Sequence, residues 1–211
     1  MKKILVSGSG TNVGKTYFCK NLVQKLLQLQ STVQYIKPIE TGLENSLEKD
    51  ARYVSQQKKE HLFNLEVITL LKFKFPMAPA DAARLEGFTL KYENILNKIH
   101  KLPKEKDFRI IEGAGGIAVP LEKSKKDWLD LALDLQLDMI VLVVENKLGA
   151  INQSRLAHQY CRSKFSGKLM IYLNNIQKLP NEIQKSNSET LLDLGIDTTE
   201  NVSEIINQFQ L

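Results

Sequence analysis

The feature that most constrains the fold is a glycine-rich turn that directly follows an apolar run near the start of the chain. Residues 8–16 read GSGTNVGKT, and the run ILV stands at 4–6. After the turn, apolar residues recur at spacings of four, four and three, which is typical of one face of a helix; they are Phe18, Leu22, Leu26 and Leu29. A strand, a glycine turn and an amphipathic helix in this order begin a βαβ unit, which indicates a largely parallel sheet.

Further apolar runs with β-branched residues alternate with helical patterns. The first run extends over KKILVSG (2–8), and the others are VQYIKP (33–38), FRIIEG (108–113), DMIVLVVE (138–145) and KLMIYLNN (168–175). Continuous apolar runs are expected of strands buried on both faces of a parallel sheet. Helical patterns fit at 90–100, 127–135 and 150–162. We therefore predict a single P-loop α/β domain over residues 1–211, with a doubly wound, mainly parallel sheet and helices on both faces.

Two local expectations refine this prediction. Pro38 should stop the second strand, because proline cannot donate to a strand ladder. The polar stretch 176–190 should be a surface excursion.

The cysteines Cys19 and Cys161 have no motif around them, so we expect buried helix residues in a reducing compartment. The histidines His61, His100 and His158 share no metal-binding spacing and should be surface or helix residues, whereas Trp128 should be core.

Composition excludes several classes of protein. With 43% apolar and 25% charged residues, the 211-residue chain is typical of a globular domain. Its longest apolar run, MIVLVV at 139–144, is too short to span a membrane, and its start lacks the apolar core of a signal peptide. The net charge of +5 lies in short clusters without a basic, aromatic face. We therefore expect a cytoplasmic protein that binds neither membrane nor nucleic acid.

Two glycine codes compete for the opening turn. The dinucleotide code G-x-G-x-x-G requires glycine where Val13 stands, so that interpretation fails. The P-loop code G-x-x-x-x-G-K-[ST] ends correctly with GKT at 14–16, but Ser9 occupies the place of its first glycine. Gly8 lies one residue further out, which makes the turn a P-loop variant with five residues between the glycines.

A turn with this longer spacing between the glycines can still bind a phosphate. Backbone N–H groups at the start of a helix can surround a phosphate, and the helix dipole favours its negative charge. Lys15 can reach the β- and γ-phosphates, and the Thr16 hydroxyl can bind Mg²⁺. The turn is therefore predicted to hold a nucleoside triphosphate.

Two more polar segments follow predicted strands. KPIETG (37–42) brings Lys37 and Thr41 to the end of one strand, and Glu112 followed by GAGG ends another. Taken alone, Lys37 or Glu112 could be a solvated surface residue, and Asp50 in EKDARY could be a surface aspartate. Because the carboxyl ends of parallel strands meet at one edge, where such sheets bind ligands, we expect these groups to converge on the phosphate turn.

Together and in this order, these segments resemble the dethiobiotin synthetase family. The matching segments are GSGTNVGKT, KPIETG with Asp50 downstream, APADAARLEG (78–87), IIEGAGGIAVPL (110–121) and VENKLGAINQS (144–154). The resemblance covers roughly residues 1–175, and the five-residue glycine spacing is the family's own. It implies a ligase of biotin biosynthesis, a doubly wound homodimer that uses ATP, Mg²⁺ and CO₂ to close the ureido ring of 7,8-diaminononanoate through a carbamate and a carbamic-phosphoric anhydride.

The resemblance also implies roles for individual residues. Catalytic roles would fall to Lys37, Lys15 and Thr11. The nucleotide would contact Gly10, Thr11, Asn12, Val13, Gly14, Lys15, Thr16, Glu112, Gly115, Asn174 and Asn175. The metal would be held by Thr16, Asp50 and Glu112. The substrate would contact Lys37, Thr41 and the segment that dimers lend to the neighbouring site, Leu148, Gly149, Ala150, Ile151 and Asn152.

Two departures from the family pattern leave questions open. Ala80 stands where members often carry a histidine, and the carboxyl-terminal segment lacks a Gly-x-Ile-Pro turn near the base. Base selectivity, and the choice between Asn174 and Asn175 as the base contact, therefore stay open.

Three other classes of protein fit these residues less well. A cobyrinic acid amidase would need an added glutaminase domain. A nucleotide-driven switch ATPase acting through protein or DNA partners typically carries a lysine where Gly10 stands. A nucleotide-binding protein that has lost catalysis is disfavoured by the presence of Lys15, Thr16, Lys37 and Glu112.

Overall fold

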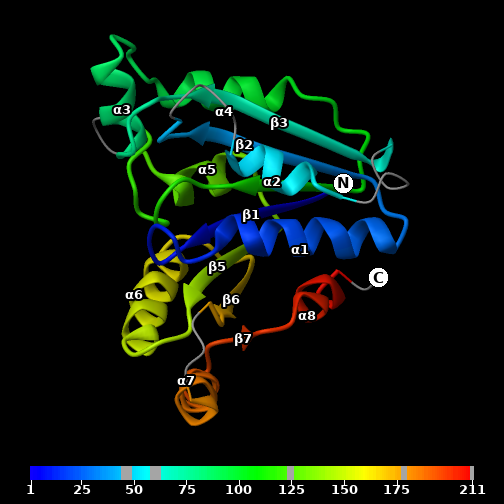
Figure 1. Ribbon diagram of the computed structural model, residues 1–211, viewed down its shortest axis with the longest axis vertical. Helices are drawn as coiled ribbons and strands as arrows, with labels where there is room; N and C mark the ends of the chain where they lie inside the picture. The colour runs from blue at the N-terminus through cyan, green and yellow to red at the C-terminus, as the bar shows by residue number, and fades with distance from the viewer. Residues whose placement is uncertain (44–48, 58–62, 123–125, 177–179, 210–211) are drawn as a thin grey trace.

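The computed structural model describes residues 1–43, 49–57, 63–122, 126–176 and 180–209. The described residues form a seven-stranded sheet in the order β3-β2-β4-β1-β5-β6-β7, and all its neighbouring strands run parallel (Figure 1). The strands are β1 (Lys2–Gly8), β2 (Val33–Glu40), β3 (Leu65–Lys72), β4 (Phe108–Glu112), β5 (Met139–Glu145), β6 (Lys168–Asn174) and β7 (Thr198–Thr199).

Helices cover both faces of this sheet. One core cluster joins the sheet to α1 (Lys15–Gln28), α2 (Lys49–Ser55) and α8 (Val202–Asn207). The other joins it to α3 (Pro79–Leu85), α4 (Tyr92–His100), α5 (Trp128–Asp134), α6 (Ala150–Arg162) and α7 (Asn181–Asp193). The doubly wound parallel fold predicted from the sequence is confirmed, while the assignment of residues 1–211 to one domain stays a prediction.

The central strands show why the apolar runs were informative. Every residue of β2, β4 and β5 is buried, so side chains on both faces of these strands must pack against helices. All five predicted strands and all three predicted helices are present, with ends that differ by at most two residues. Cys19 and Cys161 are buried, unpaired helix residues, and Trp128 is fully buried, as predicted.

The structure corrects one local prediction and refines another. Pro38 does not stop β2, because the strand continues to Glu40 and pairs with β3 beyond the proline, Ile39 opposite Leu71. The described residues of the stretch 176–190 are mostly exposed, as predicted for a surface excursion, but 181–190 are the first part of α7, a helix that was not predicted. The sequence prediction also missed β3, an edge strand whose residues are only partly buried.

The two histidines that the structure describes are helix residues, as predicted. His100 is exposed at the end of α4, His158 is half-buried on α6, and His61 lies outside the described residues. In the part of the chain that the structure describes, none of the helices is long and apolar enough to cross a membrane.

Candidate active site

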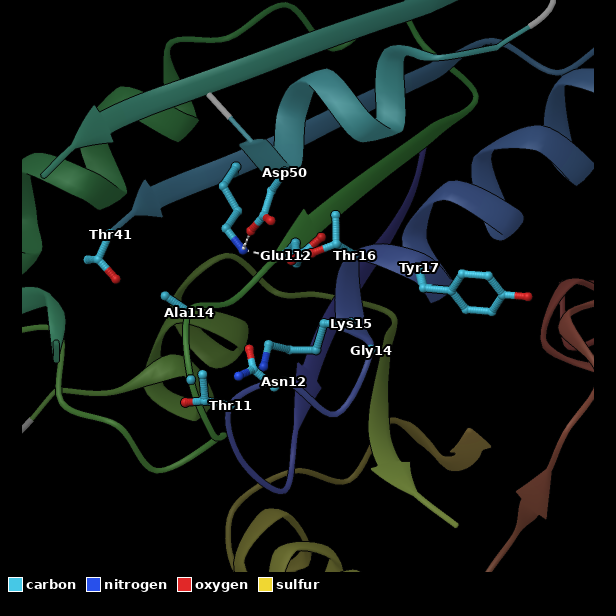
Figure 2. Close-up of a pocket in the computed structure, with 12 residues that line it drawn as sticks. Thr11, Asn12, Gly14, Lys15, Thr16, Tyr17, Thr41, Asp50, Glu112 and Ala114 are labelled. Carbon is cyan, nitrogen blue, oxygen red and sulfur yellow. Dashed lines mark hydrogen bonds and ion pairs between the residues drawn. The ribbon is translucent and has the colours of Figure 1, made fainter. Parts of the chain in front are cut away.

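The predicted polar groups converge where β1, β2 and β4 end (Figure 2). In the sheet register Val6 of β1 lies beside Glu112 of β4, and Ile36 of β2 lies beside Ile111, so Lys37 and Glu112 are neighbours across the strands. They face a cavity of about 360 Å³. The predicted residues that line it are Thr11, Asn12, Gly14, Lys15, Thr16, Lys37, Thr41, Asp50, Glu112 and Gly115; Tyr17 and Ala114, which were not predicted, complete the lining.

The loop after β1 has the backbone that a glycine-rich phosphate loop requires. Gly14, at the N-cap of α1, has φ 91°, and Asn12 has φ 59°, both in the left-handed region. A Cβ on Gly14 would lie 1.9 Å from the amide nitrogen of Asn174, so a side chain at position 14 is excluded by both conformation and space. Val13 is buried below the loop rather than in the cavity.

Lys15 folds back over this loop. Its Nζ donates a hydrogen bond to the carbonyl oxygen of Gly10 at 2.7 Å. Burial, together with the neighbouring charge of Lys37, lowers the pKa of Lys15 to about 8. An anion bound in the loop would stabilise the charged form of Lys15, which is the behaviour expected of a phosphate-binding lysine.

Glu112 is the centre of the polar network. Its side chain is fully buried, and its two oxygens accept three hydrogen bonds. Oε1 accepts from the Thr16 hydroxyl at 2.8 Å and from Lys37 Nζ at 2.6 Å, while Oε2 accepts from the Tyr35 hydroxyl at 2.8 Å. Burial and the charge of Glu112 raise the pKa of Tyr35 well above its ordinary value, so the phenol keeps the proton that it donates.

Lys37 joins Glu112 to Asp50. Its Nζ lies 2.6 Å from Asp50 Oδ2 as well as 2.6 Å from Glu112 Oε1. Burial by itself would lower the pKa of Lys37, but the two carboxylates outweigh it and raise the pKa above its ordinary value. Asp50 is held by Glu40, whose Oε1 accepts the backbone N–H groups of Lys49 and Asp50, each at 2.7 Å. Lys37 is therefore a buried ammonium between two anions, beside the phosphate loop.

The oxygen donors of this network fit a magnesium ion. The Thr16 hydroxyl and the Glu112 carboxylate are in contact, and the Asp50 carboxylate reaches the same ammonium group as Glu112. Carboxylate and hydroxyl oxygens are the ligands that Mg²⁺ prefers. The two carboxylates carry two negative charges against the single positive charge of Lys37, so a net negative charge is left for a metal cation.

A second cavity, of about 640 Å³, adjoins the phosphate loop through Gly14 and Tyr17 and is also lined by Asn175 and Glu200. Asn174 and Asn175 hold different positions in it. Asn174 is buried and donates from Nδ2 to the carbonyl oxygen of Val13 at 2.9 Å, whereas the exposed Asn175 donates from Nδ2 to Glu200 Oε2 at 2.7 Å. Asn174 thus braces the loop, and Asn175 stands at the cavity wall.

The predicted segment Leu148–Asn152 lies outside both cavities. Gly149 adopts φ 91° at the N-cap of α6, and the side chain of Leu148 is 91% exposed. Leu148, Gly149 and Asn152 are thus exposed, whereas Ala150 is buried in the core and Ile151 packs against it.

Sequence reasoning missed Tyr35, Tyr17, Ala114 and Glu200. A signal for Tyr35 existed, because a residue two positions before Lys37 in a strand points to the same face as Lys37. No comparable pattern marks Glu200, which reaches Asn175 only because β6 and β7 are neighbours in the sheet.

Comparison with solved structures supports the fold. A ParA family ATPase from Chlorobium tepidum superposes with a TM-score of 0.52 at 14% identity, over 94% of this chain and 82% of that one. The pNOB8 ParA bound to nonspecific DNA gives a TM-score of 0.55 at 12% identity, over 91% and 74% of the two chains. Identities this low support a shared P-loop fold and carry no functional argument.

Comparison with known sequences identifies the family. A family described as an AAA domain matches residues 2–205. The ATP-dependent dethiobiotin synthetase of Wolinella succinogenes is 37% identical over 160 residues, 74% of this chain and 73% of that protein. The synthetase of Bacillus subtilis is 34% identical over 200 residues, 90% and 82% of the two chains. With this agreement and the P-loop site described above, the chain belongs to the dethiobiotin synthetase family.

Proposed function

We propose that this protein carries out the ATP-dependent conversion of 7,8-diaminononanoate and CO₂ to dethiobiotin, with release of ADP and phosphate. The observation that carries the proposal is the Lys37 ammonium, held between Glu112 and Asp50 at the edge of the phosphate loop. A buried cation beside a triphosphate site suits a reaction in which a small anion must approach the γ-phosphate.

The nucleotide is bound mainly by the backbone. The N–H groups from Gly10 to Thr16 and the turn at Gly115 surround the phosphates, with Asn12 and Thr11 at the rim of the cavity. Lys15 exchanges its bond to the Gly10 carbonyl for the phosphate oxygens. Thr16, Asp50 and Glu112 would hold Mg²⁺, which neutralises charge on the phosphates when bound.

The substrate is held on the other side of Lys37. One amine of the diamine forms a carbamate with CO₂. Lys37 and Thr11 orient this carbamate, and the Thr41 hydroxyl forms a hydrogen bond with it. A carbamate oxygen attacks the γ-phosphorus, and ADP leaves. The second amine then attacks the carbonyl carbon, phosphate leaves, and the ureido ring closes. Lys37 and Lys15 stabilise the negative charge that is shared during phosphoryl transfer.

The site is completed by a second copy of the chain. The segment Leu148–Asn152, which includes Gly149, Ala150 and Ile151, would reach the neighbouring subunit's substrate through its backbone; Leu148, Gly149 and Asn152 are its exposed residues. A homodimer therefore forms part of this proposal, in a cytoplasmic enzyme.

The base occupies the cavity beside Gly14 and Tyr17. A carbonyl and a carboxylate can only accept hydrogen bonds, so Asn174 and Asn175 must both turn their NH₂ groups toward Val13 and Glu200. Asn175 then presents its carbonyl oxygen to the cavity. An acceptor there favours a base with an exocyclic amino group, as adenine has, and Asn175 is the base contact while Asn174 supports the loop.

The experiment that tests the proposal is ADP release from Mg·ATP and bicarbonate, with and without 7,8-diaminononanoate, followed by the mass of the product. Diamine-dependent ADP and a ureido product are expected. ADP release that is indifferent to the diamine would contradict the proposal and favour the alternative, a nucleotide-driven switch acting through protein or DNA partners.

A further inference from the structure

Tyr35 has no role in the proposed chemistry, yet it contacts the centre of the site. It lies on β2 two residues before Lys37, its side chain is fully buried, and its hydroxyl donates to Glu112 Oε2 at 2.8 Å. A tyrosine in a central strand is expected to be a core residue, and the Tyr35 ring does pack in the core cluster under α1 and α2. The hydroxyl, however, ends on the one carboxylate that meets both Thr16 and Lys37.

The two oxygens of Glu112 have separate tasks. Oε1 faces the cavity and accepts from Thr16 and Lys37, whereas Oε2 accepts from Tyr35 on the core side. With Oε2 held, the carboxylate cannot rotate about its terminal bond without breaking a buried hydrogen bond. Oε1 is therefore kept on the side of Thr16, where a cation bound by both residues would lie.

Removing the phenol hydroxyl would take its hydroxyl donor from the buried Oε2. Among the described residues, Thr16 and Lys37 donate to Oε1, and the buried Cys19 thiol, a weak donor, also interacts with the carboxylate. A buried carboxylate oxygen without a donor is costly, so the group would turn to share Thr16 and Lys37 between its two oxygens. That rotation changes the geometry offered to a metal without removing any ligand.

We propose that Tyr35 is a positioning residue, which orients Glu112 through Oε2 and thereby sets the affinity of the site for its divalent cation. The inference rests on the proposed role of Glu112 as a metal ligand. Groups that orient metal ligands through a second hydrogen bond typically change metal affinity by about 10–100-fold when they are removed.

The test is the affinity for Mn²⁺ in the presence of ADP, measured by electron paramagnetic resonance, for the wild type and for Tyr35→Phe. We expect Mn²⁺ to bind about 10-fold more weakly to the variant, since one orienting hydrogen bond is lost. In steady-state assays the Mg²⁺ concentration for half-maximal rate should rise, while kcat at saturating Mg²⁺ changes little. Mn²⁺ affinity within twofold of the wild type would overturn the inference.

Two controls separate this inference from its foundation. Tyr92→Phe removes a hydroxyl from another buried tyrosine that donates to a carboxylate, Asp134, away from the site, and it should leave Mn²⁺ affinity unchanged. Glu112→Gln tests the metal role itself. If Glu112→Gln also leaves Mn²⁺ affinity unchanged, the proposed metal role fails; if it weakens binding and Tyr35→Phe does not, the inference on Tyr35 alone fails.

A second measurement covers the case in which Tyr35→Phe does not fold. With 3-fluorotyrosine placed at position 35 of the otherwise unchanged protein, the ¹⁹F resonance should shift when Mg²⁺ and ADP are added together, because the phenol contacts the carboxylate that receives the metal. A resonance that does not move would overturn the inference.

Discussion

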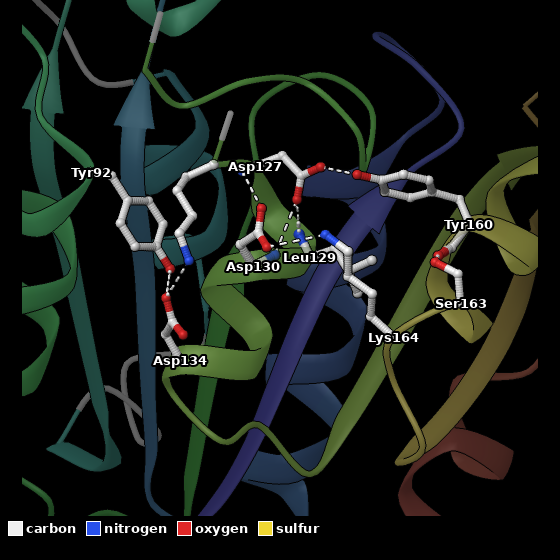
Figure 3. A network of polar contacts seen from close by, with 9 residues as sticks. Tyr92, Asp127, Leu129, Asp130, Asp134, Tyr160, Ser163 and Lys164 are labelled. Carbon is white, nitrogen blue, oxygen red and sulfur yellow. Dashed lines mark hydrogen bonds and ion pairs between the residues drawn. The ribbon is translucent and has the colours of Figure 1, made fainter. Parts of the chain in front are cut away.

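Two tyrosine–carboxylate–lysine groups of the same composition occupy different environments in this molecule. Tyr35, Glu112 and Lys37 form the first, on the central strands β2 and β4. In the second, the Tyr92 hydroxyl donates to Asp134 at 2.6 Å, and Lys126 lies 3.2 Å from the same oxygen (Figure 3). The side chain of Lys37 is 4% exposed, whereas that of Lys126 is 41% exposed. Both carboxylates accept from a tyrosine hydroxyl and a lysine ammonium, on separate oxygens in Glu112 and on one oxygen in Asp134, and the two lysines differ in their exposure to water.

The difference in exposure bears on which group serves the proposed chemistry. A buried ion pair gives little or no net stability, because both charges lose their hydration, so a chain that keeps one gains something other than stability. An exposed pair like that of Lys126 contributes between zero and about 1 kcal/mol and needs no functional explanation. The second group joins α4 to α5, beside the N-cap where Asp127 accepts from Tyr160 of α6, and it serves packing.

The largest expected difference between the two groups is in turnover. Lys37→Ala should lower kcat by at least about 10²–10³-fold, since it removes a buried cation from the place where charge develops. ATP binding, followed by calorimetry, should survive because the loop amides and Lys15 are intact. Lys126→Ala should change kcat by less than about twofold, as expected for an exposed pair. Near-normal product formation by Lys37→Ala would exclude Lys37 from the mechanism.

The next difference is in stability. Glu112→Gln leaves Lys37 buried with Asp50 as its remaining anion, and it should lower the free energy of unfolding by about 3 kcal/mol, as typical for breaking a buried pair. Asp134→Asn should cost less than about 1 kcal/mol. Urea unfolding of both variants at pH 7 measures the difference. Equal losses would mean that burial does not distinguish the two groups.

A smaller effect should depend on pH. The hydrogen bond from Tyr92 lowers the pKa of Asp134, so this contribution to stability is present above the carboxyl's unfolded value, about 4. It is lost as the pH falls through the lowered folded value. Tyr92→Phe should therefore cost about 1 kcal/mol at pH 7, and less as the solution is acidified below about pH 4. Thermal unfolding from pH 7 to pH 3 tests this, and a constant cost would contradict it.

The smallest effect is expected at Asn175, whose amide donates to a third, exposed carboxylate, that of Glu200. Asn175→Ala should reduce the preference for ATP over ITP by at most about 10-fold, the value of one hydrogen bond, because hypoxanthine lacks the amino group that Asn175 would accept from. The rate with saturating ATP should stay the same. Competition assays with the two nucleotides give the ratio, and an unchanged ratio would remove Asn175 as the base contact.

The same contrast explains what could be predicted from the sequence. The buried strands and the phosphate loop were predictable because continuous apolar runs and the GKT turn are local patterns. Lys37 and Glu112 were predictable as neighbours because parallel strands end at one edge. Tyr35 was missed because an aromatic residue in a buried strand is explained by packing alone, and its hydroxyl partner is 77 residues away.

The remaining errors have physical causes as well. Pro38 was expected to end β2, but the strand resumes its pairing with β3 at Ile39, so a missing N–H interrupts the ladder without ending it. The helix α7 was missed because its buried residues include only one large apolar side chain, Leu191, with Asn187 as the other. A helix that buries so little has no clear apolar face in the sequence.

The strand order also determines when the site can exist during synthesis. β1 is the first strand to leave the ribosome, yet its partners on both sides, β4 and β5, begin at Phe108 and Met139. Asn174, which braces the phosphate loop at Val13, follows it by 161 residues. Contacts so distant in sequence form late and slow the folding of a domain. The apolar strand β1 therefore has no partner strand until most of the chain has been translated. The phosphate loop is among the first segments to be translated and among the last to gain its contacts.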